Sequence, residues 1–398
     1  MPKVVVQKFG GTSLATAELR EVAAARVLAC HSSGFRPVVV VSAIGRNGSP
    51  YATDTLLAFA HESGDLSGRS HDLIASCGEI ISTVVFSEVL KSLGVDAVPL
   101  TGAQAGIVTN GVFRTGRVKA IDCSRIRTHI ESGQIPVVAG YQGLTADGDI
   151  TTLGRGGSDT TACMLGAALQ AARVEIYTDV DGLMTADPRV VPEASLITEA
   201  EYSEVRVLAQ KGASVIHPEA LEFASDAGVP LHIRSAKSSI PGTIVHFLSN
   251  VSPVTGIASF SDVDFFRLPS ARKRPYASGL GVFSDIADAN ISVHFIDVRP
   301  AETTFVVETK YSAAVAELLS ARGVAFQTSS EYAKVSVIGV GMTGKPGMMA
   351  TVVDTLSDRE IAIFQSTDSQ TSISVLVLRE DEPEAVRSLH KAFGLGAE

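Results

Sequence analysis

The sequence has few cysteines and no long hydrophobic run. Its 398 residues include four cysteines, Cys30, Cys77, Cys123 and Cys163, which are widely separated and form no CxxC pair. This pattern indicates reduced thiols in a reducing compartment rather than a disulfide framework or a zinc site. No stretch approaches the roughly 18 apolar residues of a membrane-spanning helix. The N-terminal sequence MPKVVVQKFGG also lacks the apolar core and cleavage site of a signal peptide, so we expect a cytoplasmic protein.

Basic residues are outnumbered by acidic ones. The chain has 33 Lys and Arg against 43 Asp and Glu, a net charge of -10, and no basic stripe that could neutralise phosphates. These features argue against a nucleic-acid partner. No histidine cluster has the spacing of a metal site, and no Ser/His/Asp triad stands out, so we expect no metal held by protein ligands alone. With 45% hydrophobic and 19% charged residues, the composition indicates a globular protein of two or three domains.

Short apolar segments alternate with helical stretches through the N-terminal part of the chain, before the segment 238–258. The segments lack polar alternation, as strands buried on both faces do, and most end in Gly, Thr, Ser or Asp. Thr12 and Ser13 are expected to cap a helix over about residues 15–29. The pattern predicts an α/β fold, a three-layer αβα sandwich around a mostly parallel sheet, with ligands at the carboxyl ends of the strands. The predicted strands are 4–7, 37–43, 96–102, 135–143 and 174–182.

An internal repeat follows a segment rich in Ser, Pro and Gly at 238–258, which we interpret as a linker. All its matching segments share one constant offset along the chain and keep the order strand, helix, strand, strand. Two apolar helices that resembled each other by chance would not also keep their strands in register. The repeat therefore predicts two copies of a small βαββ-type unit. The matching segments are 265–269 with 335–339, 282–295 with 352–365, and 305–308 with 375–378.

The segment VVVQKFGGTS (4–13) places Lys8 at the end of a buried strand, before Gly10 and Gly11. The glycines would let backbone N–H groups approach an anion, and a helix N-terminus favours negative charge. The segment is not a P-loop, whose pattern is GxxxxGK[ST]. An ordinary strand-turn-helix joint with a surface lysine is the alternative.

The segment GRGGSDTTA (154–162) gives a stronger signal. Arg155 could hold a carboxylate through two parallel hydrogen bonds. Ser158 or Asp159 could simply cap the following helix, and Asp159 could form a structural ion pair with Arg155. Recognition of an amino acid, however, needs a cation and one or more anions close together, and Arg155 with Asp159 and Glu79 would meet that need.

Other polar positions give weaker signals. Thr178, Asp179 and Arg189 in YTDVDGLMTADPR (177–189) could line a nucleotide pocket, although a loop with Asp-driven turns explains the same residues. Thr53 lies at a helix start, where a cap is also plausible. His217 precedes a proline and is more typical of packing or capping than of catalysis.

Taken in order, KFGGTS, GRGGSDTTA and TDVDGLMTADPR resemble the aspartate kinases of the amino acid kinase superfamily. The paired repeat resembles their two ACT domains, so the resemblance covers nearly the whole chain. The stretches VVVVSAIGRNGSPYATDTLL and IAIFQSTDSQTSISVLV are most similar to the shorter bacterial isozymes regulated by meso-diaminopimelate. The resemblance implies a catalytic domain over 1–248, a linker and first ACT domain over 249–331, and a second ACT domain over 332–398 that includes a strand at about 254–258.

The family's reaction is the transfer of a phosphoryl group from ATP, with Mg²⁺, to the β-carboxylate of L-aspartate. This is the first step towards lysine and diaminopimelate, threonine and methionine, and the ACT domains imply dimers or larger oligomers and feedback by an amino acid such as diaminopimelate, lysine or threonine. By resemblance, Lys8 contacts the phosphoryl group and the β-carboxylate, Arg155 holds the α-carboxylate, and Glu79 and Asp159 face the amino group. The remaining aspartate contacts would be Thr53, Gly156, Gly157 and Ser158.

The resemblance also implies an ATP side and an effector site. The ATP side would comprise Lys8, Phe9, Gly10, Gly11, Ser42, Thr178, Asp179, Met184, Arg189 and Lys211. Effector contacts would be Asn290, Ile291, Gln365 and Asp368.

Three positions depart from the family pattern, all on the ATP side. Met184 stands where a tyrosine is common, Ser214 replaces a lysine and Glu219 replaces an arginine. Lys211, one helical turn before Ser214, could substitute for the missing lysine. Two alternatives remain at this stage: a related kinase for another acid, and an amino-acid sensor without catalytic activity.

Overall fold

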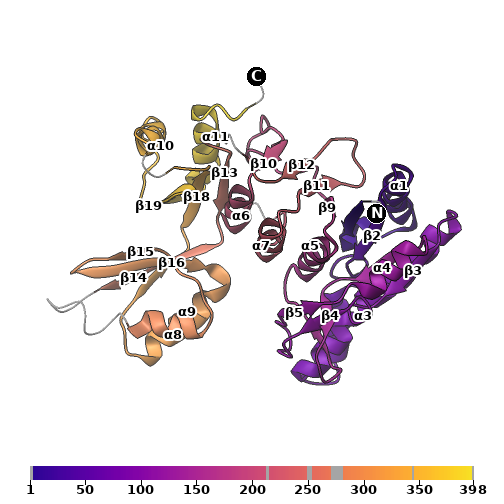
Figure 1. Ribbon diagram of the computed structural model, residues 1–398. Coiled ribbons are helices and arrows are strands. Elements are labelled where there is room, and N and C mark those ends of the chain that lie inside the picture. The colour runs from indigo at the N-terminus through magenta and orange to yellow at the C-terminus, as the bar shows by residue number, and fades with distance from the viewer. Residues whose placement is uncertain (1–2, 212–214, 249–252, 270–280, 343–344, 397–398) are drawn as a thin grey trace. The chain divides into compact units, whose positions relative to one another are not determined.

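The structure is a computed structural model that describes residues 3–211, 215–248, 253–269, 281–342 and 345–396 (Figure 1). The chain divides into two compact units. Unit 1 comprises residues 1–183, 196–209 and 214–250, and unit 2 comprises 184–195, 210–213 and 251–398. Each unit is described by itself below.

Unit 1 is built on an eight-stranded sheet with the order β10-β12-β11-β9-β1-β2-β6-β3. Neighbouring strands are parallel except β11 and β12, which are antiparallel, so the prediction of a mostly parallel sheet is confirmed. The strands are β1 (Val4–Phe9), β2 (Arg36–Val41), β3 (Ala97–Leu100), β6 (Ile135–Ala139), β9 (Arg173–Thr178), β10 (Glu199–Ala200), β11 (Leu231–Ser235) and β12 (Thr243–Val245).

Helices cover both faces of this sheet, and β1 shows how the sequence directs side chains to each layer. Gln7 and Phe9 point towards α1 (Ala17–Ser32) and α3 (Gly68–Ser92): Phe9 packs with residues of both helices, and Gln7 donates to a carbonyl of α1. Lys8 alternates with them and reaches α5 (Gly157–Leu169) on the opposite face. The three-layer αβα prediction is therefore confirmed. The remaining helices are α2 (Thr53–His61), α4 (Ser124–Glu131), α6 (Tyr202–Lys211) and α7 (Pro218–Asp226).

The carboxyl ends of three central strands lie side by side. In the parallel register Phe9 is opposite both Val41 of β2 and Tyr177 of β9. The residues that follow these strands, including Ser42 and Thr178, therefore meet at one edge of the sheet, as the sequence pattern predicts.

A second, four-stranded sheet of unit 1 has the order β5-β4-β7-β8 and was not predicted. Its strands are only three or four residues long, and β5 is largely exposed, so the apolar signal is weak. They are β4 (Ile107–Thr109), β5 (Val118–Ile121), β7 (Gln142–Leu144) and β8 (Ile150–Thr152).

Two local predictions were wrong. The cap of α1 is Thr16, whose hydroxyl accepts from Leu19 N–H at 3.3 Å, whereas Thr12 and Ser13 lie in the short 3-10 helix η1 (Gly11–Leu14). The segment 238–258 is also not only a linker, because β12 within it pairs with β11 in the large sheet. The turn residues around β12 hid its short strand.

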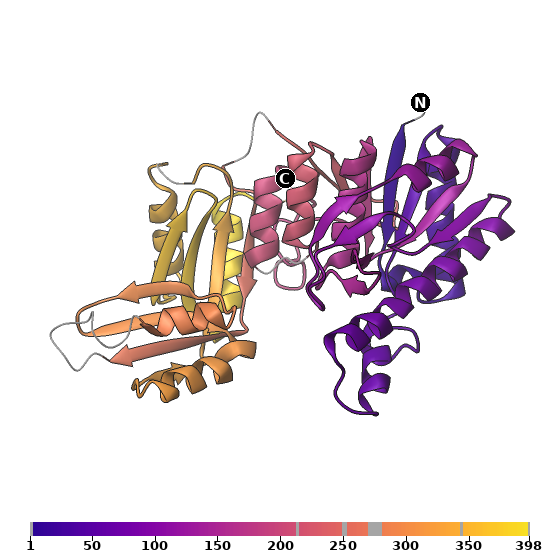
Figure 2. The same ribbon diagram turned by 60° about the horizontal axis from the view of Figure 1, so that its bottom comes forward.

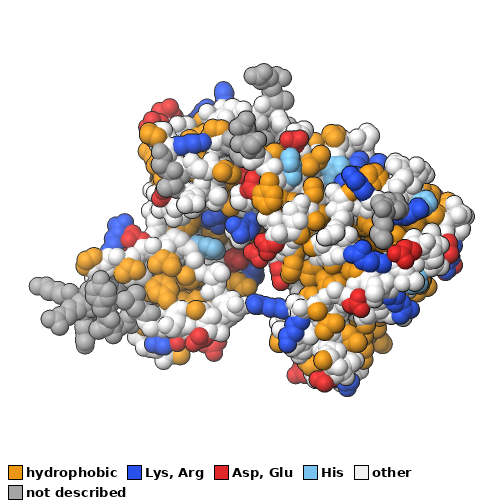
Figure 3. All heavy atoms as spheres, in the orientation of Figure 1, with side chains coloured by type: hydrophobic (Ala, Val, Ile, Leu, Met, Phe, Trp, Pro, Cys, Tyr) orange, Lys and Arg blue, Asp and Glu red, His pale blue; other side chains and the backbone are white. Residues whose placement is uncertain are grey.

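By length and composition alone, α3 is apolar enough to cross a membrane, whereas no such segment was expected from the sequence. Half of its most apolar 18-residue window is buried in the protein, and its Asp72 and Glu79 are both buried. These are properties of a core helix as well. On the face shown in Figure 3, acidic and basic side chains are interspersed.

Unit 2 contains two small domains, each with a four-stranded antiparallel sheet and two helices packed on one face (Figure 2). The first C-terminal domain consists of β14 (Val263–Pro269), α8 (Gly281–Asp288), β15 (His294–Val298), β16 (Glu302–Glu308), α9 (Ser312–Ala321) and β17 (Gln327–Ser329). The second C-terminal domain consists of β13 (Gly256–Phe260), β18 (Tyr332–Ile338), α10 (Met348–Ser357), β19 (Gln365–Ser369), β20 (Ser372–Leu378) and α11 (Glu382–Ala392).

The order of elements in the two domains confirms the internal repeat. β16 begins at Glu302 and β20 at Ser372, which is the offset that the sequence predicts, and each forms a central strand of its sheet. β13 precedes the first domain in the chain and pairs with β18 of the second.

Two segments expected in the catalytic domain pack instead within unit 2. Ala186 and Val191 lie in the core of the second C-terminal domain, and Thr185 Oγ1 is 2.9 Å from His390 Nε2 of α11. The end of α6 also belongs to unit 2, where Lys211 contacts Ser374. The apolar residues of 184–195 complete a core whose other members lie far along the chain, which local sequence patterns do not indicate.

Candidate functional site

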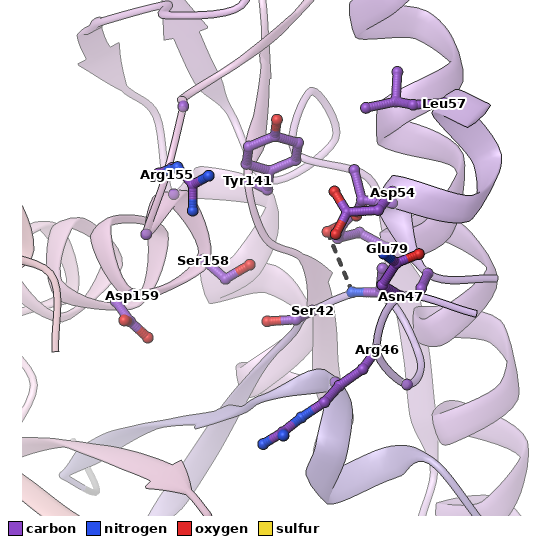
Figure 4. A pocket seen from close by; sticks show the side chains of 18 of the residues that line it. Ser42, Arg46, Asn47, Asp54, Leu57, Glu79, Tyr141, Arg155, Ser158 and Asp159 are labelled. Carbon is purple, nitrogen blue, oxygen red and sulfur yellow. Dashed lines mark hydrogen bonds between the residues drawn. The ribbon is translucent and has the colours of Figure 1, made fainter. Parts of the chain in front are cut away.

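A cavity of about 450 Å³ opens in unit 1 beside the carboxyl ends of β1 and β2 (Figure 4). Its wall includes the start of α2, the middle of α3 and the loop that leads into α5. Polar groups from segments that are distant in the sequence therefore meet there. Of the residues predicted from the sequence, the lining contains Lys8, Gly11, Ser42, Thr53, Glu79, Arg155, Gly156, Gly157, Ser158 and Asp159.

Lys8 and Asp159 form an ion pair across the interface between β1 and α5. Lys8 Nζ lies 2.7 Å from Asp159 Oδ1, and the two side chains are only 12% and 13% exposed. At this burial the pair is screened less by water than a surface pair. Asp159 is thus paired with Lys8, so the alternative of a structural Arg155–Asp159 pair is excluded.

Arg155 is exposed at the cavity, and within the described ranges its guanidinium forms no ion pair or hydrogen bond. Figure 4 shows Arg155, Ser158 and Glu79 around the same space. A guanidinium without a protein partner keeps all its donors for a ligand, and its planar fork matches a carboxylate.

The loop that carries Arg155 has a conformation that requires glycine. Gly156 has φ +71°, and a Cβ on this residue would lie 2.2 Å from the Cβ of His217. Gly156 is also the N-cap position of α5, so Ser158 and Asp159 lie inside the first turn and neither is the cap. His217 packs against the loop from the start of α7, which agrees with its interpretation as a packing residue.

Glu79 is buried in α3 with a side chain that is only partly satisfied. Its Oε1 accepts from the backbone N–H of Ala43 at 3.2 Å, whereas Oε2 has no hydrogen-bond partner among the described residues. Burial raises the pKa of Glu79 to about 8, although hydrogen bonds from the backbone oppose the shift. At neutral pH the carboxyl group of Glu79 is therefore mostly protonated, and an ammonium group bound beside it would favour the carboxylate form.

The residues predicted for the ATP side divide into a group at or next to the cavity and a group away from it. Gly11 lines the cavity, and a Cβ on it would lie 2.2 Å from the carbonyl oxygen of Ala43, so glycine is required here because the backbone packs closely against residues 43–45. Asp179 forms an ion pair with Arg46, a cavity residue, and also accepts from Thr178 Oγ1 at 3.2 Å.

The other predicted ATP-side residues do not line this cavity. The guanidinium of Arg189 is paired with Asp187 through several hydrogen bonds, which satisfies the charge proposed for phosphate. Met184, Arg189 and Lys211 all belong to unit 2. Ser214 lies outside the described residues. The roles of these residues remain predictions.

The structure corrects the predicted roles of two residues and places the predicted effector contacts in two different domains. The ring of Phe9 is fully buried and stacks on Tyr177 with centroids 4.6 Å apart, so it is a core residue. Ile291 is likewise buried in the core of the first C-terminal domain. Asn290 follows α8 in that domain, whereas Gln365 and Asp368 lie on β19 of the second. Gln365 Nε2 donates to Thr304 Oγ1 of the first domain at 3.1 Å.

Sequence reasoning missed several cavity residues. Arg46 lies in a loop of small residues, and Tyr141 has a positive φ of +70°. Neither feature can be recognised from the residue types of a single sequence. His71 also lines the cavity, and its Nδ1 is 3.0 Å from Asp72 Oδ1. Asp72 is fully buried and accepts from the backbone N–H and the hydroxyl of Thr152. The other cavity residues missed were Ala43, Gly45, Asn47, Ala52, Asp54, Leu57 and Gly154.

Across the described part of the chain, no group of three or more His, Cys, Asp or Glu could hold a metal ion.

Comparison with known proteins agrees with this fold. Residues 3–235 match the model of the amino acid kinase family, and residues 327–391 match an ACT domain. The chain is 43% identical to aspartokinase 1 of Bacillus subtilis over 99% of both chains, and 39% identical to the aspartokinase of Geobacillus stearothermophilus over 99% of this chain and 98% of that protein.

Solved structures give the same result. The crystal structure of E. coli aspartokinase III in complex with aspartate and ADP has a TM-score of 0.80 with this chain, at 26% identity, and covers 98% of this chain and 99% of that one. The complex of the same enzyme with lysine and aspartate gives the same values. By its full-length similarity to these proteins, its large mostly parallel sheet and its paired C-terminal domains, the chain belongs to the aspartokinase family.

Proposed function

We propose that the protein transfers the γ-phosphoryl group of ATP to the β-carboxylate of L-aspartate and releases ADP and 4-phospho-L-aspartate. The observation that carries this proposal is the charge pattern of one cavity. The unpaired guanidinium of Arg155, the Lys8–Asp159 pair and the buried carboxyl of Glu79 all line it. The family's reaction and the E. coli enzyme's complex with aspartate and ADP support the choice of substrates.

Aspartate carries two carboxylates and one ammonium group, and the cavity offers a partner for each. Arg155 would hold the α-carboxylate through a bidentate pair of charge-assisted hydrogen bonds. Glu79 would lose its proton and accept from the ammonium group, with Asp159 as a second acceptor nearby. Lys8 would then lie beside the β-carboxylate, where its ammonium can also contact the incoming phosphoryl group.

The nucleophile in this reaction needs no activation by a base. A β-carboxylate has a reference pKa of about 4 and is ionised at neutral pH, so no residue has to remove a proton. Catalysis then depends on alignment of the two substrates and on the neutralisation of negative charge between them. Lys8 serves both purposes, since Asp159 fixes the position of its ammonium group.

The nucleotide phosphates would approach the backbone at Gly11, which lines the cavity at the end of β1. Mg²⁺, when bound with ATP, would reduce the charge of the phosphates, and in such sites it keeps water and phosphate ligands with few from protein. The absence of a three-residue metal cluster in the described ranges is compatible with that mode.

We further propose that the two C-terminal domains bind an amino-acid end product, such as diaminopimelate, lysine or threonine, and mediate assembly into a homodimer or larger oligomer. The complex of E. coli aspartokinase III with lysine supports an amino-acid effector. We also propose that the enzyme is located in the cytoplasm.

A coupled assay of ADP release tests the main proposal. With ATP and Mg²⁺, ADP should form only when L-aspartate is added, and hydroxylamine should trap the acyl phosphate as a hydroxamate. Glutamate, acetylglutamate and uridine monophosphate serve as comparison acceptors. ADP release without dependence on aspartate, or faster release with another acceptor, would contradict the proposal. Addition of lysine, threonine and diaminopimelate to the same assay identifies the effector.

A further inference from the structure

The sheet of the second C-terminal domain has one apolar face and one polar face. Along β18, Val335 and Val337 pack against α10 and α11. Lys334 and Ser336 alternate with these valines, so they point to the opposite face. Ser374 lies opposite Ser336 on β20, and the two hydroxyl oxygens are 2.8 Å apart. Lys334 is only 4% exposed, so a buried lysine shares this face of the sheet with the two hydroxyls.

The polar face meets the first C-terminal domain within unit 2. Leu376, the cross-strand neighbour of Lys334, packs in one hydrophobic cluster with Val306 of β16. His294 of β15 is the cross-strand neighbour of Val306, so both side chains lie on the same face of their sheet. This packing brings His294 towards Lys334.

A second lysine reaches the same face from the end of α6. Lys211 Nζ lies 3.5 Å from Ser374 Oγ. The two lysines act electrostatically on each other, and both act on His294. We refer to Lys211, Lys334, His294, Ser336 and Ser374 together as the lysine cluster.

The lysine cluster has no matching negative charge among the residues that the structure describes. Neither Lys211 nor Lys334 takes part in an ion pair there. Glu308 is the acidic group that acts on Lys334, but its carboxylate already pairs with Lys310.

The pKa values of the lysines and of His294 show that this arrangement disfavours their charged forms. Burial, and then the charge of Lys211, lowers the pKa of Lys334 to about 8, and burial lowers the pKa of Lys211 as well. Burial followed by the two lysine charges lowers the pKa of His294 to about 4. Buried cations that repel each other are retained at a cost in stability unless an anion joins them.

We propose that the lysine cluster binds a small oxyanion, a phosphate or carboxylate group, between the ammonium groups of Lys334 and Lys211. The hydroxyls supply a further donor: if Lys211 donates to Ser374 and Ser374 donates to Ser336, the hydrogen of Ser336 remains free for the anion. Charge-assisted hydrogen bonds to one buried and one partly buried ammonium group make such a site strong for its size. The site shares no residue with the substrate cavity, so it is a second anion site of the chain.

Thermal unfolding of the full-length protein tests this proposal. Melting temperatures are measured in sodium phosphate and in sodium citrate, each against sodium chloride at equal ionic strength. We expect a rise in one or both anions, and the anion that causes it identifies the site as one for phosphate or for carboxylate. In Lys334→Met and in Lys211→Met, the half-saturating anion concentration should increase about tenfold or more.

Two variants locate the effect. Lys391→Met removes an exposed lysine from α11 and should leave the anion response unchanged. Lys8→Met removes the ammonium group of the substrate cavity, so any part of the response that this variant loses belongs to that cavity and not to the lysine cluster. Loss of the response in Lys8→Met but not in the cluster variants would overturn the proposal, as would a wild-type protein that responds to neither anion.

An NMR titration of the wild-type protein decides the question even if a cluster variant does not fold. With lysines labelled with ¹³C at Cε, the pKa of Lys334 should rise from about 8 when the anion is present, because an opposite charge favours the ammonium form. A pKa of Lys334 that is unchanged at saturating phosphate and citrate would refute the site.

Discussion

Aspartate binding should release a proton from Glu79, and the amount can be calculated from the structure. With a pKa of about 8 before the substrate binds, about 0.9 of the Glu79 carboxyls are protonated at pH 7. An ammonium group beside the carboxylate lowers this pKa, and a return to the ordinary value near 4.5 would leave the group fully ionised. Binding at pH 7 should therefore release about 0.9 proton, and binding at pH 8 about 0.5.

Calorimetry measures this release directly. Aspartate is titrated into the enzyme without ATP in several buffers, and the slope of the observed enthalpy against the buffer ionisation enthalpy gives the number of protons. The affinity for aspartate should also weaken about fivefold from pH 8 to pH 7 and about ninefold from pH 7 to pH 6, because a proton and the ammonium group compete for one carboxylate.

The matched variants are Glu79→Gln and Glu88→Gln, both on α3. Glu79→Gln removes the titrating group and should give a slope near zero with weaker binding. Glu88 is exposed and pairs with Lys91, so Glu88→Gln should keep the wild-type slope. A wild-type slope near zero at pH 7, or a normal slope in Glu79→Gln, would refute the assignment of Glu79 to the ammonium group.

Three further predictions follow from other parts of the structure. Arg155→Lys keeps the charge but loses the planar fork, so the KM for aspartate should rise about tenfold or more. Arg69→Lys changes an exposed ion pair and should leave KM unchanged. A normal KM in Arg155→Lys would exclude Arg155 from binding the α-carboxylate. Gly156→Ala should lower the free energy of unfolding by roughly 1–3 kcal/mol because of the positive φ, and further because the new Cβ would clash with His217. Adding His217→Gly should recover only the stability lost through this clash, as measured by denaturant titration. The folded pKa of His294 lies below its unfolded value of 6.5, so the fold is most stable above pH 6.5, where this histidine is neutral. Roughly 2–3 kcal/mol of the free energy of unfolding should be lost as the pH falls from 6.5 towards 4. The loss should be shallower in His294→Leu, and equal pH profiles of the two proteins would contradict this prediction.

The sequence was sufficient to predict five of the eight strands of the large sheet, β1, β2, β3, β6 and β9, because they are short, largely apolar runs; β10, β11 and β12 were not predicted. Such runs reflect burial on both faces, and each run over β1, β2, β6 and β9 leads directly to a glycine or a small polar residue. The loop of Arg155 was predictable for a related reason, since glycines on both sides of one arginine imply an unusual backbone and a long cation at the same point.

Other features depend on contacts between distant segments and give no local signal. The partner of Asp159 is Lys8 on the first strand of the chain, and only the packing of α5 on β1 brings the two side chains together. The raised pKa of Glu79 arises from burial in the folded protein, whereas in sequence the residue is one glutamate of a long helix. The packing of residues 184–195 against α11 was missed for the same reason.

The path of the chain between the two units limits how the protein can be divided. Residues 184–195 belong to unit 2, the chain then returns to unit 1, and it reaches unit 2 again at the end of α6 and after residue 250. A single cut near residue 250 would leave Ala186 and Val191 on the N-terminal fragment without the core that buries them, and would open a gap in the C-terminal fragment. We therefore expect co-expressed halves to associate, and either half produced alone to aggregate, so domain-exchange experiments in this enzyme should transplant the crossing segment together with the C-terminal domains.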